Sequence, residues 1–154
     1  MRPKRLISLL VAVCMMITML PLSAVTAFAA DTPSSTEQEI SVGDYKYAYT
    51  VNAGGSTATI TKFLGPVDSE GNVDFTNHGP YDINIPSELD YYSVTGLGDY
   101  SFATEENASP LYDIHHHNIQ SVTIPESVTS IGQFAFESCF SLESLIIKDA
   151  ATSI

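Results

Sequence analysis

Short runs of alternating apolar and polar residues are the main pattern in the C-terminal third of the chain. In the segment that ends at Ile124, Val122 and Ile124 fall on one side of an extended chain, and Ser121 and Thr123 fall on the other. A period of two predicts a short β-strand with one buried face. Pro125 follows directly and is expected to end the strand, because proline has no backbone N–H.

This strand pattern repeats along the chain. The pattern Ile-x-x-Val-x-Ile of residues 119–124 returns as Leu-x-x-Leu-x-Ile in residues 142–147, a shift of 142 − 119 = 23 residues. A period in the twenties is typical of a repeat solenoid, in which each copy buries its apolar edge against the next. We therefore expect a mainly β solenoid. An irregular earlier copy aligns in two blocks, residues 83–86 with 122–125 and residues 94–102 with 128–136.

The part of each copy that follows the strand is expected to bend and return to the core. Gly132 has no Cβ and is expected to permit a tight bend. Residues 133–139 are too few for a regular α-helix and predict a single helical turn, with Phe136 as its core anchor. The positions expected to point inward are Ile119, Val122, Ile124, Val128, Ile131, Ala135, Phe136 and Cys139.

Ahead of the repeats, the pattern predicts a β-hairpin. Apolar and aromatic residues alternate in residues 45–51, the turn residues Asn-Ala-Gly-Gly occupy 52–55, and a second alternating run covers 58–62. We expect this hairpin to cover the apolar end of the first copy, as the N-terminal cap of a solenoid does.

The predicted segments divide the chain as follows. Residues 31–39 are polar without apolar periodicity and predict a flexible lead-in. A capping region is expected over residues 40–80, including a loop from Leu64 to Pro80 with a short strand at 73–75. The repeats are expected over residues 81–154, as an irregular first copy with an insertion at 103–118, a regular copy at 119–141 and an incomplete copy at 142–154.

The first thirty residues have the pattern of a secretory signal peptide. Basic residues open the chain, an apolar run covers residues 6–20, and Ala27-Phe28-Ala29 supplies a small-x-small cleavage site. We expect residues 1–30 to be removed, with an uncleaved membrane anchor as the alternative.

Cysteine use agrees with removal of this segment. Cys14 leaves with the signal peptide, and Val13 before it is not the small residue that a lipid-attachment signal needs. Cys139 then remains alone, so the mature chain forms no intrachain disulfide. We expect Cys139 to be a buried, small apolar residue rather than a nucleophile.

The charge balance excludes several classes of partner. The whole chain has a formal charge of −12. Without the signal peptide it keeps three lysines against eighteen acidic residues, a formal 3 − 18 = −15. Such a field repels nucleic acid and anionic membranes, so we expect neither nucleic-acid binding nor membrane insertion after cleavage.

These residues carry a family resemblance. The run from Val122 to Cys139, Val-Thr-Ile-Pro-Glu-Ser-Val-Thr-Ser-Ile-Gly-Gln-Phe-Ala-Phe-Glu-Ser-Cys, resembles the BspA-type leucine-rich repeat. It departs from ordinary leucine-rich repeats at Ser127, which occupies the place of an asparagine after the strand. The resemblance implies a secreted or cell-surface protein whose repeats form a binding scaffold, in several members for adhesion.

A histidine cluster in the predicted insertion is a candidate metal site. His115 and His117 would point to the same side of an extended strand, and with Asp113 they form a weak candidate for zinc or another divalent ion. An exposed polar loop is the alternative. Our expectation is that the protein needs no metal or other cofactor.

Two further groups of residues are weaker candidates. The alternating Asp68-x-Glu70-x-Asn72-x-Asp74 has some of the ligands of a calcium loop but lacks glycine at its sixth position, so a solvated turn is expected instead. Five tyrosines crowd the irregular copy and either contact a protein or sugar or pack the enlarged copy: Tyr81, Tyr91, Tyr92, Tyr100 and Tyr112.

No catalytic constellation is recognisable, so the protein is not expected to be an enzyme. The leading hypothesis is a secreted or cell-surface, non-enzymatic scaffold that binds host or microbial surface macromolecules, protein or glycan, for adhesion. The alternative is an accessory repeat region of a larger secreted enzyme such as a peptidase or glycosidase.

The last copy has its strand but not the glycine and aromatic turn that follow it. We therefore expect further sequence downstream, and we expect residues 1–154 alone to be marginally stable or to associate through the open edge.

Overall fold

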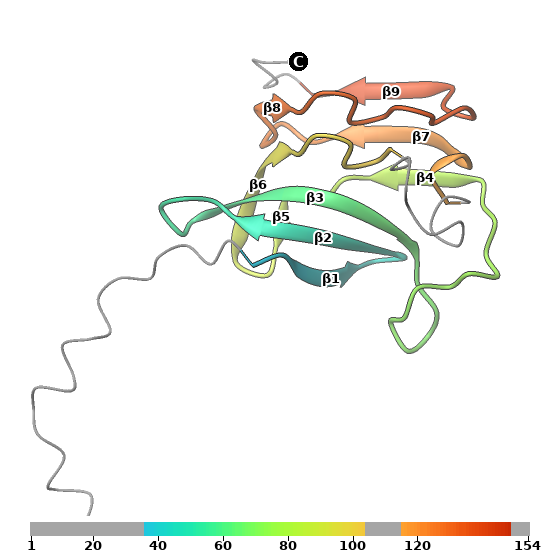
Figure 1. Cartoon of the computed structure of the whole chain (residues 1–154), viewed down its shortest axis with the longest axis horizontal. Helices are drawn as coiled ribbons and strands as arrows, with labels where there is room; N and C mark the ends of the chain where they lie inside the picture. Colours follow the sequence, from blue (N-terminus) through green and yellow to red (C-terminus); the bar gives the residue numbers. More distant parts are fainter. Residues whose placement is uncertain (1–35, 104–114, 149–154) are drawn as a thin grey trace, which may run out of the picture. The chain divides into compact units, whose positions relative to one another are not determined.

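The computed structural model of the protein describes residues 36–103 and 115–148 (Figure 1). The chain divides into two units, residues 1–32 and residues 33–154, and every described residue belongs to the second. The expected signal peptide therefore lies outside the described residues, as do Asp113 and Tyr112.

The N-terminal strands form an antiparallel meander of β1 (Gln38–Val42), β2 (Tyr45–Val51) and β3 (Thr57–Pro66). The predicted hairpin is confirmed as β2 and β3. Asn52 starts its turn, accepting a hydrogen bond from the Gly55 N–H at 3.0 Å and donating its own N–H to the Thr57 carbonyl at 2.9 Å. Strand β1 was not predicted from the sequence; its apolar Ile40 lies opposite Tyr47 of β2.

A three-stranded parallel sheet contains the repeated strands, β4 (Tyr81–Asn84), β7 (Ile119–Ile124) and β9 (Ser144–Ile147) (Figure 1). Val122 of β7 lies opposite Leu145 of β9, which is the predicted 23-residue shift. Ile83 of β4 lies opposite Val122, as the alignment of the irregular copy requires. The repeat alignment from sequence is therefore also the register of the sheet.

A second sheet continues the meander, because β3 pairs in parallel with β6 (Tyr92–Leu97) and β6 pairs in parallel with β8 (Ser130–Ile131). Leu97 lies opposite Ile131, so the second block of the predicted alignment is also confirmed. Between the two aligned blocks of the irregular copy lies β5 (Glu88–Leu89), which makes a tight antiparallel hairpin with β6.

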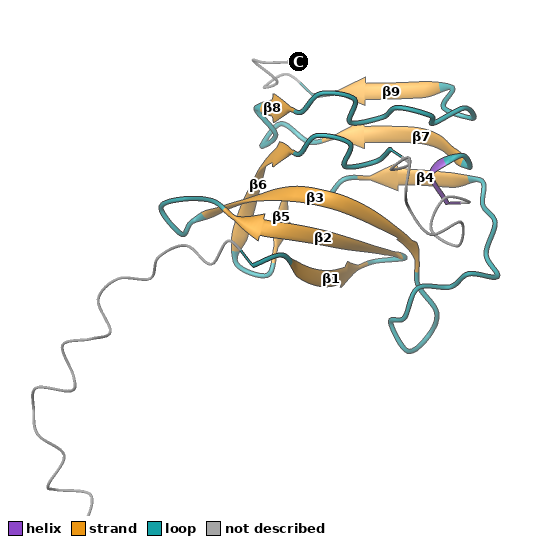
Figure 2. Cartoon of the chain, viewed as in Figure 1, coloured by secondary structure: helices purple, strands orange, loops and turns teal. Residues whose placement is uncertain are grey.

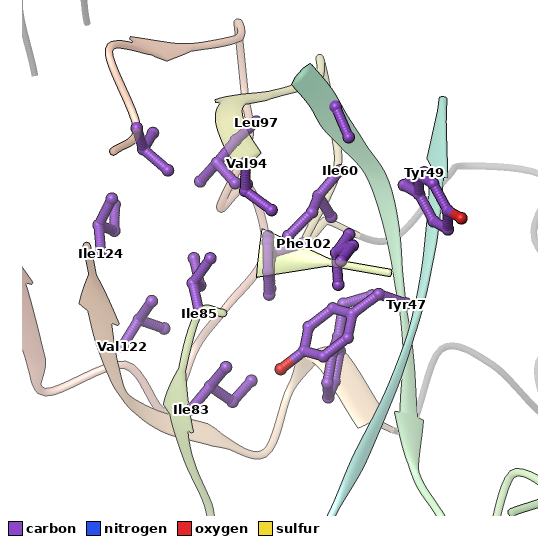
Figure 3. Packing of buried hydrophobic residues seen from close by; sticks show 14 of the residues in the cluster. Tyr47, Tyr49, Ile60, Ile83, Ile85, Val94, Leu97, Phe102, Val122 and Ile124 are labelled. Atoms are coloured by element: carbon purple, nitrogen blue, oxygen red, sulfur yellow. The ribbon is translucent and has the colours of Figure 1, made fainter. Parts of the chain in front are cut away.

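The core lies between these strands (Figure 3). Phe63, Phe102 and Phe136 come from successive levels and stack, with ring centroids 5.5 Å apart for the first pair and 5.2 Å for the second. Five of the eight predicted inward positions are buried, namely Ile119, Val122, Ile124, Val128 and Ala135. Ile131, Phe136 and Cys139 pack on the cluster while partly exposed.

The predicted single helical turn at residues 133–139 is wrong. This segment passes through consecutive turns, and helix within the described part of the chain is assigned only to His115 and His116 (Figure 2). The backbone of Phe134 has φ 56° and that of Ser138 has φ 62°. Residues in this left-handed region cannot continue a right-handed helix.

Gly132 was expected to permit a tight bend, and the structure gives a different reason for glycine at this position. A Cβ on Gly132 would lie 2.4 Å from the backbone nitrogen of Asp99 in the preceding copy. The Gly132 N–H also donates to the Leu97 carbonyl at 2.8 Å. Glycine is needed because the backbones of two successive copies come into direct contact at this corner.

Candidate binding surface

One edge of the repeats is formed by turns rather than by strands. We call it the turn side, and it consists of residues 98–103 in the first copy and 132–141 in the second. The two segments lie in register, because the Tyr100 N–H donates to the Gln133 carbonyl at 3.0 Å and the Phe102 N–H donates to the Ala135 carbonyl at 2.7 Å. Side chains at matching positions are therefore neighbours.

Tyr100 and Phe134 occupy one such pair of matching positions on the turn side. Their rings stack with centroids 5.2 Å apart and planes at 23°. Both side chains are exposed, 41% for Tyr100 and 55% for Phe134, and both backbones have φ 56°. A left-handed conformation costs a residue with a Cβ about 1–2 kcal/mol. Stacking of the two rings offsets this cost by about 0.5–1.5 kcal/mol. The two left-handed residues thus expose their rings to solvent without a clear gain in core packing.

A second aromatic pair lies where the turns lead into the next strand. His117 and Phe140 are separated by the 23-residue repeat, and their ring centroids are 5.2 Å apart. Phe140 is 81% exposed. The sequence analysis missed both phenylalanines, although their repeat relation to Tyr100 and His117 is visible in the alignment and could have identified them.

The ionised side chains of the turn side are acidic. Asp99 reaches the next copy, where its Oδ1 accepts a hydrogen bond from the Gln133 N–H at 2.8 Å. Glu137 is exposed, and its backbone N–H donates to the Phe134 carbonyl at 2.9 Å, so it lies in the same turn as that ring. Among the described residues, Asp99 and Glu137 are the charged groups between positions 98 and 103 and between 132 and 141.

The outer face of the sheet β4-β7-β9 is polar and lacks such rings. Asp82 of β4 accepts a hydrogen bond from the Ser121 hydroxyl of β7, and Ser144 of β9 continues this row. Asn84 and Thr123 form the next row, which ends at the exposed, apolar Ile146 of β9. Small polar side chains make this face flat and able to hydrogen-bond, but nothing in it selects one class of ligand.

The outer face of the second sheet is also polar, and its groups bond to one another. Asn52 Nδ2 donates to Thr57 Oγ1 at 2.9 Å, and Thr59 Oγ1 donates to Asn52 Oδ1 at 2.8 Å. Asn52 Nδ2 also donates to Thr95 Oγ1 at 3.3 Å. These contacts use the hydrogen-bonding groups internally, so we do not place the site there.

The histidine cluster is divided between different environments. His115 and His116 are buried, whereas His117 is partly exposed beside Phe140. His116 Nε2 lies 3.1 Å from the Phe63 carbonyl. Asp113 lies outside the described residues, and within the described part no three His, Cys, Asp or Glu side chains come together as a metal site. Metal binding by His115 and His117 stays a prediction.

The hydrogen bonds of His115 define its tautomer. The Tyr81 hydroxyl has one proton, which it donates to the Asn77 carbonyl at 2.5 Å. Tyr81 must then accept from His115 Nδ1, which lies 2.9 Å away. His115 Nε2 therefore carries no proton, and it is buried without a hydrogen-bond partner. Burial lowers the pKa of His115, His78 lowers it further, and Asp74 opposes them.

The loop with alternating oxygen ligands is organised by internal hydrogen bonds. Asp68 Oδ1 accepts from the N–H groups of Glu70 and Asn72, both at 2.9 Å. Asp74 Oδ1 accepts from the Thr76 N–H at 2.9 Å and from its hydroxyl at 2.6 Å. These are the side-chain bonds of tight turns. The predicted short strand at residues 73–75 is reduced to one bridge between Val73 and Val67.

The tyrosines of the irregular copy do not form one cluster. Tyr81 is a buried core residue, and the ring of Tyr92 contacts Tyr49. Tyr91 is 92% exposed at the turn between β5 and β6, and Tyr100 belongs to the turn side. The two alternatives predicted from the sequence therefore apply to different tyrosines. Tyr81 and Tyr92 pack against other residues, whereas Tyr91 and Tyr100 are exposed to a potential partner.

Cys139 packs against the core as predicted, but it is not fully buried. It is partly buried, and its Sγ donates to the Phe102 carbonyl at 3.2 Å. Burial raises the pKa of its thiol to about 11. A thiol that stays protonated near neutral pH is a poor nucleophile.

Comparison with protein families and with solved structures gives consistent results. Residues 112–154 match the family model described as BspA type leucine rich repeat region, six copies. A leucine rich cell surface protein from Faecalibacterium prausnitzii A2-165 is 31% identical, with a TM-score of 0.47; the match covers 78% of this chain and 26% of that protein. No curated protein matches the chain.

Two further solved structures are similar. A leucine-rich repeat protein from Bacteroides capillosus ATCC 29799 is 30% identical, with a TM-score of 0.45, over 71% of this chain and 64% of that one. A leucine rich repeat protein of T. pallidum is 21% identical, with a TM-score of 0.52, over 74% of this chain and 41% of that one, and shows the fold alone. The chain thus spans less than two thirds of the length of each of these proteins.

No helix within residues 36–103 or 115–148 has the length and apolar character needed to cross a bilayer.

Proposed function

From the premise that residues 112–154 belong to the BspA-type leucine-rich repeat family, we propose that this chain is an extracellular, non-enzymatic scaffold. It binds macromolecules of host or microbial surfaces, and the turn side is the contact surface. The observation that carries the proposal is the stacked, solvent-exposed pair Tyr100 and Phe134 at matching positions of two copies. Exposed aromatic residues are frequent anchors of binding surfaces.

In this proposal the repeats form a solenoid and the β2–β3 hairpin is its N-terminal cap. The contacts of the hairpin with the first copy support it. Phe63 stacks on Phe102, and both Phe63 and Tyr45 contact the ring of Tyr81, with centroids 6.4 Å and 6.1 Å away. The hairpin thus covers apolar surface that would otherwise face water.

The proposal also includes export. Residues 1–30 direct the chain out of the cell and are removed, and residues 40–80 and 81–154 act as capping region and repeats. The signal pattern in the sequence supports this, and so does the cell-surface description of the F. prausnitzii protein.

Described side chains with catalytic potential are committed to structural contacts, which supports a non-enzymatic role. The thiol of Cys139 donates to a carbonyl, and burial raises its pKa to about 11. His115 bonds to Tyr81, and burial lowers its pKa. Asp68 and Asp74 close turns. The Ser121 hydroxyl donates to Asp82 on the flat outer face of β4 and β7, where within the described part of the chain no histidine accompanies the pair.

The test is a binding assay on immobilised extracellular matrix proteins and on a glycan array, with the mature protein and a Tyr100→Asn plus Phe134→Asn variant. Asparagine tolerates the left-handed backbone, so the corner can keep its shape. We expect the double variant to bind its best target about 5- to 30-fold more weakly, the loss typical of contact anchors.

The matched control is Tyr91→Asn, which removes an exposed aromatic residue from the β5–β6 turn. We expect it to bind like the unmodified protein. Absence of binding to every matrix protein and glycan would refute the proposed function. An equal loss in the control and in the double variant would refute the turn side as the contact surface.

A further inference from the structure

We propose that the partner of the turn side is a basic polypeptide, whose arginine or lysine side chains lie against Tyr100 and Phe134 and pair with Asp99 and Glu137. This inference rests on the proposed function and names the chemistry of its partner. It comes from the combination of exposed rings and acidic groups on one surface.

The rings are suited to a cation because they combine an apolar surface with a negative electrostatic potential over their faces. Tyr100 and Phe134 are stacked, and 41% and 55% of their side chains remain exposed to solvent, so both rings offer surface to a ligand. Arginine and lysine bind to aromatic faces through this potential, and arginine does so most often.

The charges of the turn side select the same ligand. Asp99 uses Oδ1 for the Gln133 N–H, which holds its carboxylate at the boundary of the two copies. Glu137 lies in the turn that begins at Phe134. Carboxylates only accept hydrogen bonds, whereas guanidinium and ammonium groups only donate them. An acidic surface whose carboxylates accept hydrogen bonds is therefore complementary to a basic chain whose side chains donate them.

No described basic residue belongs to the turn side and neutralises these carboxylates. Lys46 is in β2, where it forms an ion pair with Glu39 at 2.8 Å. Lys62 is in β3 and Lys148 follows β9, and the arginines of the chain lie within residues 1–30. The formal charge of the whole chain, −12, attracts a basic partner from a distance before the local contacts form.

A neutral glycan is the competing class of ligand, because sugars also stack on aromatic rings. Glycan sites add groups that both donate and accept, to match sugar hydroxyls. The turn side has such groups in Gln133, Ser141 and the Tyr100 hydroxyl. What favours the cation is the pair of carboxylates, Asp99 and Glu137, with no described lysine or arginine among residues 98–103 and 132–141.

The experiment measures binding of a fluorescein-labelled alternating Arg-Gly peptide to the mature protein by fluorescence anisotropy, with a Gln-Gly peptide of equal length as the neutral probe. A neutral β-glucan is titrated in parallel by calorimetry. The variants are Phe134→Leu, which keeps apolar bulk without a ring, and Phe134→Tyr, which keeps the ring.

Two charge variants test whether the peptide binds at the turn side or is attracted only by the overall negative charge of the protein. Glu137→Gln removes a carboxylate from the turn side, and Glu70→Gln removes one from the distant loop of residues 67–80. Thermal unfolding of every variant shows that each is folded.

We expect the Arg-Gly peptide to bind and the Gln-Gly peptide not to bind. Phe134→Leu and Glu137→Gln should each weaken binding about 3- to 30-fold, while Phe134→Tyr and Glu70→Gln stay within twofold of the unmodified protein. Binding should also weaken as salt is added.

Equal effects of Glu137→Gln and Glu70→Gln, with no effect of Phe134→Leu, would mean that only overall acidity attracts the peptide, and would overturn the inference. Binding of the β-glucan that depends on Phe134, without binding of the Arg-Gly peptide, would also overturn it while leaving the proposed function intact. Failure of the proposed function itself appears separately, as no binding on any matrix protein or glycan.

Discussion

Gly132 illustrates how a single residue can be required by its neighbour in the next copy. Its backbone is not left-handed, so the local conformation would accept any residue. The space around position 132 would not accept a side chain, because a Cβ would lie 2.4 Å from the backbone nitrogen and 2.5 Å from the side-chain Oδ1 of Asp99. Backbone atoms cannot move aside as the end of a flexible side chain can.

We therefore expect Gly132→Ala to lower the free energy of unfolding by about 1–3 kcal/mol, the usual cost of overpacking. Gly98→Ala is the matched control at the corresponding position of the first copy. There the nearest atom, the Ile60 carbonyl oxygen, would be 3.3 Å from the new Cβ, so the loss should be smaller. Urea denaturation measures both, and equal losses would contradict the argument.

His115 is a second residue whose behaviour depends on its surroundings. It is buried, its Nδ1 donates to Tyr81, and its Nε2 has no partner. Protonation would place a charge and a second N–H where nothing accepts it. Burial first, and then the neighbouring His78, keep the pKa of His115 low despite the opposing effect of Asp74.

The low pKa predicts a loss of stability in acid. The unfolded chain takes up the proton at the ordinary histidine pKa of about 6.5, and the folded chain does so only at lower pH. The contribution of neutral His115 is therefore complete above that pH and is lost as the pH falls below it. We expect the free energy of unfolding to fall between about pH 7.5 and pH 5.5.

The variant His115→Asn keeps a donor near the position of Nδ1 but does not titrate. Its stability should be lower overall and should depend less on pH than that of the unmodified protein. His117→Asn, which removes a partly exposed histidine, should keep the full pH dependence. Parallel pH profiles for the protein and His115→Asn, from urea denaturation, would show that His115 is not responsible.

At the level of strands and turns, registry between copies holds the fold together. The two parallel ladders, β4-β7-β9 and β3-β6-β8, are aligned by the same repeat. Between them, Phe102 stacks on Phe63 from β3 on one side and on Phe136 from the next copy on the other. One ring thus links three successive levels of the structure.

Phe102→Ala should accordingly lower the free energy of unfolding by about 3–5 kcal/mol, because it opens a cavity at a fully buried position. Phe140→Ala removes a ring of the same size that is 81% exposed. We expect its effect to stay within about 0.5 kcal/mol. Chemical denaturation compares the two, and a small effect of Phe102→Ala would show that the copies do not depend on the stack.

For the whole molecule, the dominant physical property is its negative charge. With a formal charge of −12 and few lysines to offset the acidic residues, the folded chain repels itself. Screening by salt shortens the range of this repulsion to about 8–10 Å at physiological ionic strength. Acidity therefore affects stability as well as the choice of partner.

We expect the melting temperature of the mature protein to rise by about 2–6 °C from low salt to physiological sodium chloride, which corresponds to roughly 1 kcal/mol or less. A variant with Glu88→Gln and Glu126→Gln, both exposed, should show a smaller rise because it starts with less repulsion. Calorimetry at matched protein concentrations measures both. A melting temperature that is independent of salt would contradict the prediction.

Much of the fold could be predicted from pattern. The alternation at Val122 and Ile124 predicted β7, and the 23-residue match predicted its pairing with β9. The run from Tyr45 to Val51 with its glycine turn predicted the hairpin. These predictions succeed because alternation and repeat spacing are properties of the chain itself, and a parallel stack of copies converts the spacing directly into register.

The errors and omissions have a common physical cause. The helical turn at residues 133–139 was wrong because hydrogen bonds from Tyr100 and Phe102 to the next copy hold Phe134 in a left-handed conformation that no local pattern reveals. The sequence pattern also did not indicate which tyrosines are buried in the core and which are exposed. Tyr81 is covered by β2, β3 and His115, whereas Tyr91 is left exposed at a turn.

The sequence alone thus determines the repetition, the strand positions and the overall acidity, because each depends only on residue order or composition. Which rings face solvent, which histidine is buried, and which carboxylates share the turn side with Tyr100 and Phe134 were decided only by the packing of one copy against another. Exposure and electrostatic environment depend on distances between atoms that are far apart in sequence, and these distances exist only after the copies have stacked.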